Sequence, residues 1–170
     1  VIPALAKVNL GVTSPLMVNA MLALSVIGIM VGAYASARKS VNSVKVNNIY
    51  TGSTTITVCA ILVPIVSTLS FIPNSTALII VSALILVFGV GAGMMLVPLN
   101  ALIQAHSAKD GLGSVLAGKN WIQNMAMIGL LLLTVLLARS NVNSVYILYL
   151  NAFIAVVGFT VVLKRLKAIL

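Results

Sequence analysis

Five of the amide side chains inside long apolar runs of this sequence fall into two groups at helical spacing. Asn100 and Gln104 lie four residues apart near the end of one run. Asn120, Gln123 and Asn124 follow at helical spacing in the next run, which places them on one face of a helix. An unpaired amide in hydrocarbon costs free energy. These residues therefore either line a water-accessible cavity or hydrogen-bond between helices, and the first alternative predicts a binding site for a polar group.

Two neighbouring features bear on this choice. Lys119 directly precedes the second amide group, and its long side chain either extends to the lipid headgroups or contacts an anionic substrate headgroup. Gly89 and Gly93 share a helical face with Asn100 and Gln104. Small residues at this spacing are typical of close helix packing in membranes. The same spacing recurs earlier in the chain as a ladder of small residues, which predicts another close helix contact: Gly28, Gly32 and Ser36.

The composition indicates what kind of protein positions these residues. The chain has 170 residues, of which 61% are hydrophobic and 6% are charged, whereas a soluble domain carries roughly 25% charged residues. This excludes a soluble globular enzyme, a disordered tail and a disulfide scaffold, and it favours a helical membrane protein. The net charge of +9 comes from scattered cations, so it indicates membrane topology rather than a nucleic-acid partner.

The apolar runs predict an all-α, polytopic membrane fold. A membrane-crossing helix needs about 20 predominantly apolar residues, and Pro and Gly punctuate the boundaries here. Short loops between the runs predict antiparallel neighbours. Residues 1–10 are expected to be the end of a sixth span whose beginning is missing, so the chain is interpreted as a fragment. The five complete runs cover residues 16–36, 53–71, 76 to about 104, about 116 to 138, and 144–163.

The cations predict the orientation of the spans. If the loop at 37–50 is cytoplasmic and the spans alternate, Lys7 and Arg139 lie outside and the other eight of the ten cations lie inside. The positive-inside rule favours this arrangement, which also places the 105–115 loop and the C-terminus in the cytoplasm. The eight inner cations are Arg38, Lys39, Lys45, Lys109, Lys119, Lys164, Arg165 and Lys167.

The sequence offers little material for catalysis. It contains no phosphate-binding loop of the G-x-x-x-x-G-K-[ST] type. His106 and Cys59 are single residues far apart in the chain, and the sole acid, Asp110, lies in a polar loop. No carboxylate pair, nucleophile–base pair or metal-ligand cluster is evident. We therefore expect a protein that is not an enzyme and that binds no metal or cofactor.

Three segments resemble a known family. They are SPLMVNAMLALSVIGIMVGA at residues 14–33, GAGMMLVPLNALIQ at 91–104 and AGKNWIQNMAM at 117–127. Their order and spacing are similar to the C-terminal half of the bacterial lysophospholipid transporters, within the major facilitator superfamily. The pattern VPLNAL-x-Q at 97–104 is the most specific match. The chain departs from the family at Gln123, where an acid is expected, and at Lys119, where an amide is expected.

The resemblance implies an architecture and a function. Residues 1–170 would form helices 8–12 and the tail of helix 7 of a major facilitator transporter, whose N-terminal half is absent here. Two halves would rock around a midplane site, moving lysophospholipids such as lysophosphatidylethanolamine across the bacterial inner membrane. The implied partners are this substrate, the membrane lipids and the missing N-terminal half. The substrate-binding residues would be Asn100, Gln104, Asn120, Gln123 and Asn124.

Two other functions remain open from the sequence. The same fold could carry a different cargo, such as a drug or a small metabolite. The chain could also be a non-transporting membrane subunit, in which the amides would only join helices. Transport of lysolipid distinguishes the first alternative, and substitution of the amides by leucine distinguishes the second.

Overall fold

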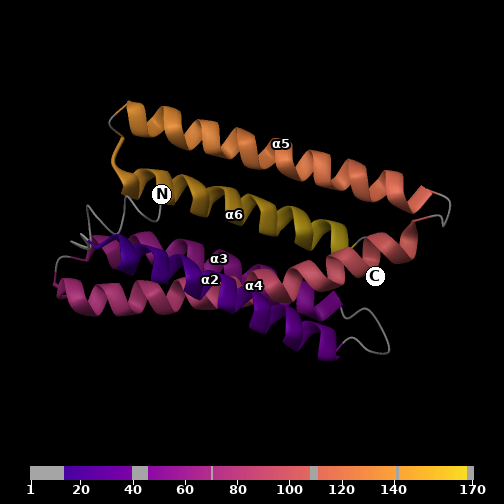
Figure 1. Ribbon diagram of the computed structural model, residues 1–170, viewed down its shortest axis with the longest axis horizontal. Coiled ribbons are helices and arrows are strands. Elements are labelled where there is room, and N and C mark those ends of the chain that lie inside the picture. The colour runs from indigo at the N-terminus through magenta and orange to yellow at the C-terminus, as the bar shows by residue number, and fades with distance from the viewer. Residues whose placement is uncertain (1–13, 40–45, 70, 108–110, 141, 168–170) are drawn as a thin grey trace.

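The computed structural model describes residues 14–39, 46–69, 71–107, 111–140 and 142–167. Figure 1 shows helices that run alongside one another and alternate in direction along the chain. The all-helical class predicted from the sequence is therefore confirmed for the described residues. The sixth span predicted over residues 1–10 and the loop cations Lys45 and Lys109 lie outside the described residues. The helices are α2 (Pro15–Lys39), α3 (Val46–Thr68), α4 (Asn74–His106), α5 (Leu112–Arg139) and α6 (Ser144–Lys167).

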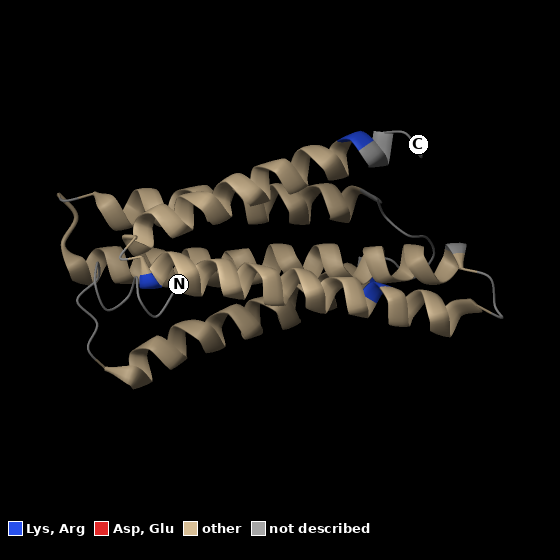
Figure 2. Cartoon of the chain, turned by 90° about the horizontal axis from the view of Figure 1, so that it is seen from above, with Lys and Arg blue, Asp and Glu red and all other residues tan. Residues whose placement is uncertain are grey.

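All five helices are long and apolar enough to cross a membrane. Their candidate spans are 21 to 32 residues long, and about 20 residues suffice to cross the hydrocarbon core. Figure 2 shows a few positively charged positions on these helices and no acidic one among the described residues. These features are those of a multi-pass membrane protein.

The start of α3 differs from the sequence prediction. The helix begins at Val46 rather than at residue 53, and it continues through Gly52. Ile49 is fully buried and Asn48 is only 6% exposed. Packing against the neighbouring helices therefore extends α3 through residues of low helix propensity, because tertiary contacts override propensity.

The predicted contact between small residues is confirmed between α2 and α4. A Cβ atom added to Gly28 would lie 3.1 Å from the Cα of Gly89, and one added to Gly32 would meet the backbone of Val90. Likewise, a Cβ on Gly93 would meet the backbone of α2. The glycines thus let two helix backbones approach closely, which is how small residues drive helix association in membranes.

A second face of α4 packs just as closely on α3. A Cβ atom on Gly91 would lie 2.9 Å from the carbonyl oxygen of Gly52, and one on Gly52 would lie 3.0 Å from the backbone nitrogen of Met95. Helix α4 therefore contacts α2 with one small-residue face and α3 with another, which makes it the central helix of this layer by its contacts.

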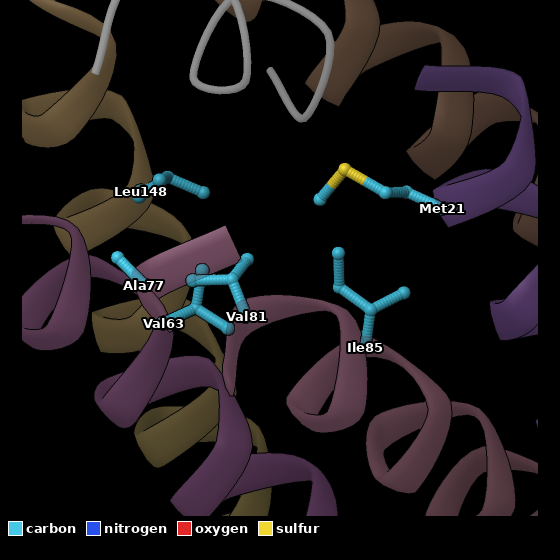
Figure 3. Packing of buried hydrophobic residues seen from close by; sticks show 6 residues of the cluster. All are labelled: Met21, Val63, Ala77, Val81, Ile85 and Leu148. Atoms are coloured by element: carbon cyan, nitrogen blue, oxygen red, sulfur yellow. The ribbon is translucent and has the colours of Figure 1, made fainter. Parts of the chain in front are cut away.

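An apolar cluster joins four of the helices. Val81 is fully buried at its centre on α4, and Met21 from α2 and Val63 from α3 approach it. Leu148 brings α6 into the same cluster, as Figure 3 shows. The contacts between α3 and α6 thereby attach α6 to the layer formed by α2, α3 and α4.

Helix α5 stands apart from this packing. None of its residues is buried, and large apolar side chains such as Trp121 and Ile122 are 65% exposed. Figure 1 shows α5 beside α6 at the edge of the assembly, farthest from α2, α3 and α4. The segment that carries three of the five candidate amides is therefore the least packed helix among the described residues.

Candidate functional site

One polar contact joins α5 to the central helix. The Nζ atom of Lys119 donates a hydrogen bond of 2.7 Å to the Oδ1 atom of Asn100, across 19 positions of sequence. The contact is possible because α4 and α5 follow one another in the chain and run in opposite directions (Figure 1), and because Asn100 and Lys119 lie at similar positions relative to the facing ends of these helices. Lys119 is thus held by a neighbouring helix instead of extending freely to the headgroups.

The electrostatics of this pair favour an anionic ligand. An ammonium group has three donors, and only one of them is used on Asn100. The amide nitrogen of Asn100 adds two more donors. No acidic residue is present among the described residues to neutralise Lys119 (Figure 2). The part-buried pair therefore has a positive charge with no acidic partner among the described residues and with unused donors, which is the chemistry that recognises a phosphate or a carboxylate.

Gln104 and Gln123 lie next to this pair along their helices. Gln104 follows Asn100 by one turn of α4, toward the α4–α5 connection, and Gln123 follows Lys119 by one turn of α5, deeper in the span. Both glutamines are exposed. Of these residues, the structure brings Lys119 and Asn100 into contact, and it places Gln104 and Gln123 one turn from that pair in opposite directions along their helices. We call Asn100, Gln104, Lys119 and Gln123 the polar cluster.

The remaining two candidates, Asn120 and Asn124, lie farther around α5. The side of α5 that faces the other helices is marked by Lys119 and by Leu130, which lines a cavity; these two residues differ by about 20° around the helix. From Lys119, Gln123 is rotated by about 40°, Asn120 by about 100° and Asn124 by about 140°. Asn120 and Asn124 are exposed, so they flank the polar cluster instead of belonging to it.

Hydrogen bonding between helices accounts for one of the five amides. Asn100 accepts the bond from Lys119. The side chains of Gln104, Asn120, Gln123 and Asn124 make no hydrogen bond to any described residue. Within the part of the chain that the structure describes, these four amides do not hold helices together.

A cavity of about 560 Å³ lies between the helices and is partly open. None of the five candidate amides lines it, and the sequence analysis did not anticipate it. Its walls come from all five helices, so no single stretch of sequence carries its pattern. One residue of the wall does stand out in the sequence: Asn151 is an amide within the fifth apolar run. The lining residues are Leu22, Ser25, Ile56, Cys59, Ala60, Val63, Ile85, Phe88, Leu130, Leu148, Asn151, Ile154 and Ala155.

A buried polar chain joins three helices and was also missed. The amide of Asn48 on α3 donates a hydrogen bond of 3.1 Å to the hydroxyl of Ser36 on α2, and that hydroxyl donates one of 3.3 Å to the carbonyl of Met94 on α4. Ser36 is fully buried. The sequence predicts Ser36 only as a small packing residue, and Asn48 falls within the predicted loop at 37–50.

Ser36→Ala is expected to destabilise the fold, because it leaves the buried amide of Asn48 without its acceptor. Interhelical hydrogen bonds in membranes contribute about 0.6 kcal/mol on average and up to about 1.7 kcal/mol, so a loss in the upper part of this range is expected. The measurement is the free energy of unfolding in detergent. Thr54→Val is the control, because Thr54 is exposed and its hydroxyl donates only to its own helix. Equal stability of the two variants would contradict the prediction.

The site has no feature of a metal centre among the described residues: no three His, Cys, Asp or Glu side chains gather there. Comparison with known proteins finds no matching family, no matching curated protein and no matching solved structure. Fold and site thus define a class, a helical protein whose five long apolar helices could each span a membrane.

Proposed function

We propose that this chain is the C-terminal half of a major facilitator transporter that moves lysophospholipids, such as lysophosphatidylethanolamine, across the bacterial inner membrane. The observation that carries the proposal is the hydrogen bond between Lys119 and Asn100, which holds a cation between two candidate spans. The sequence segments that resemble the lysophospholipid transporters include both residues. A charged residue within a membrane span is expensive, and such residues commonly mark a substrate pathway.

The chemistry of the polar cluster suits an amphiphile with an anionic group. Lys119 and Asn100 can donate to phosphate oxygens, and the amides of Gln104 and Gln123 extend the donor set by one turn on either side. Apolar residues of α4 and α5, such as Met95 and Met127, flank the cluster in sequence. Methionine adapts to irregular shapes, so these side chains can accompany the acyl chain of the substrate.

Alternating access requires a second bundle against which this one rocks, and the N-terminal half is that proposed partner. The low burial of α5 supports this part of the proposal, because α5 offers a long uncovered surface beside the polar cluster. In the proposed orientation the C-terminus is cytoplasmic, and the polar cluster lies toward the cytoplasmic end of its spans.

The test is uptake of labelled lysophosphatidylethanolamine into vesicles containing the protein expressed from its complete reading frame. Lysolipid uptake above that of protein-free vesicles, with competition by unlabelled lysolipid and none by diacyl phospholipid, is the expected result. Uptake of a drug or metabolite with lysolipid ignored would replace the proposal by a different cargo. Absence of any uptake would favour a non-transporting subunit.

The geometry of α5 predicts different effects for its three amides. Gln123→Leu is expected to lower lysolipid uptake several-fold, because Gln123 shares the inward side of α5 with Lys119. Asn124→Leu is the matched control on the same helix, and it is expected to leave uptake near the level of the unmodified protein. Both side chains are exposed in the structure, so protein yield should be unaffected. The assignment of Gln123 to the inward side of α5 would be wrong if Asn124→Leu caused the larger loss of uptake.

A further inference from the structure

The cavity between the helices is built like a site for hydrocarbon. Its walls are almost wholly apolar, and three of its residues, Val63, Ile85 and Leu148, also belong to the buried apolar cluster (Figure 3). Its volume of about 560 Å³ lies in the range of about 300–1,000 Å³ that is common for ligand pockets. Water in such a cavity finds few polar partners, so hydrocarbon suits its walls better.

One polar group on the wall has no hydrogen-bond partner among the described residues. The hydroxyl of Ser25 is satisfied by the carbonyl of Leu22 in its own helix, at 2.7 Å. The side-chain amide of Asn151 is half-buried and makes no hydrogen bond to any described residue. Asn151 lies about 10 Å along α6 from its first residue, at a rise of about 1.5 Å per residue. Because an unpaired amide at this depth costs free energy, a ligand atom that accepts its hydrogen bond would be stabilised.

We propose that this cavity binds the single hydrocarbon chain of an acyl amphiphile, with the amide of Asn151 donating to the ester carbonyl oxygen at the polar end of that chain. The chain enters from the surrounding bilayer, because the cavity is partly open and its helices are those of a membrane protein. One cavity with one unpaired amide fits one chain with one polar end, in contrast to the two chains of a bilayer phospholipid.

This site is separate from the polar cluster, and the inference does not depend on transport. Phe88, the lining residue of α4 nearest to Asn100 in sequence, precedes it by 12 positions. That spacing corresponds to about 18 Å along the helix. Binding in the cavity can therefore succeed or fail independently of substrate movement past Lys119.

The test uses a lysophospholipid that carries a photoreactive diazirine in its acyl chain, added to the whole protein in dioleoylphosphatidylcholine vesicles. After illumination, adducts are mapped by mass spectrometry. We expect them to concentrate on the cavity-lining positions of α3 and α6, including Cys59 and Ala155. An excess of non-photoreactive lysophospholipid should reduce these adducts several-fold, whereas added diacyl phospholipid should not. Adducts on the outward positions Val58 and Val157 should be insensitive to both.

Cavity-filling variants complete the test. Ala155→Phe places a ring into the cavity from α6 and is expected to reduce the cavity adducts several-fold. Val157→Phe is the matched control, because Val157 is on the same helix, is 45% exposed and does not line the cavity. Ala60→Phe fills the cavity from α3, and it replaces Ala155→Phe if that variant does not fold.

Three results would overturn the inference. They are adducts spread evenly over the outward faces, equal competition by diacyl phospholipid, and cavity-filling variants that behave like Val157→Phe. The first would show that the cavity takes no chain, the second that ordinary bilayer lipid occupies it, and the third that the adducts arise elsewhere. A negative uptake assay combined with specific cavity adducts would reject the proposed transport and leave this site standing.

Discussion

Gly93→Ala is expected to be among the most destabilising single substitutions in the described part of the chain. A Cβ atom at this position would meet the carbonyl of Ile29, and it would lie 2.6 Å from the backbone nitrogen of Ala33. Both are backbone atoms, so no side chain can rotate away and α2 itself must move. Overpacking costs about 1–3 kcal/mol, occasionally more. We expect the free energy of unfolding, measured in detergent, to fall by the upper end of that range.

Gly129→Ala is the matched control for this prediction. Gly129 lies within α5, and a Cβ atom there would meet nothing within 4 Å. Because alanine has a higher helix propensity than glycine by about 0.8–1.0 kcal/mol, this variant is expected to be as stable as the unmodified protein or more so. If Gly93→Ala and Gly129→Ala unfolded alike, the close contact between α2 and α4 would not exist in the membrane protein.

The contrast between these glycines shows how far the sequence predicts the fold. The spacing of Gly28 and Gly32, and of Gly89 and Gly93, correctly predicted close packing, because small residues at helical spacing serve that purpose. The sequence did not predict that the two ladders face each other. Nor did it predict a second contact of α4, through Gly91, since single glycines carry no periodic signal.

Helix boundaries were predictable only where local chemistry sets them. The start of α6 at Ser144 matched, whereas α3 begins earlier than predicted. The reason is the burial of Asn48, whose amide bonds to Ser36 of another helix. A hydrogen bond between residues on different helices leaves no trace in local composition, so a polar residue beside a loop was read as part of that loop.

The sequence predicts which candidate site residues share a face of one helix, but it does not predict which residues of different helices meet. Spacing grouped Asn120, Gln123 and Asn124 as one face. Which part of that face points inward depends on the contact between Lys119 and Asn100, and a pairing of two helices lies beyond a single-helix pattern. The cavity was out of reach for the same reason, since its lining is shared among all five helices.

The two proposed binding regions divide the requirements of an amphiphile between them. The polar cluster has charge and donors but lies on a weakly packed helix, and the cavity has apolar walls and one unpaired amide, that of Asn151. Helices α4 and α5 each contribute to both regions, through Phe88 and Leu130 at the cavity. Because α5 borders both regions, its position bears on the shape of each.

Lys119→Met is expected to lower lysophospholipid uptake at least about tenfold. A hydrogen bond to a charged group contributes about 1.5–3 kcal/mol, and each 1.4 kcal/mol corresponds to about a factor of ten in affinity. Lys164→Met is the control, because Lys164 is exposed near the end of α6 and bonds to no described residue. The measurement is the initial uptake rate of a lysophospholipid. Binding of an uncharged monoacylglycerol is measured beside it and should not be changed by Lys119→Met.

Stability separates a binding role for Lys119 from a structural one. A lone cation in a span is costly, so Lys119→Met should leave the free energy of unfolding unchanged or raise it, while uptake falls. If the hydrogen bond to Asn100 instead served only to hold α5 in place, both Lys119→Met and Asn100→Ala would lower stability, and the double variant would lose no more than either single one. That outcome would assign the pair to helix packing. Lost uptake at preserved stability, with partial recovery in Lys119→Arg, is the result that only an anion-binding role produces.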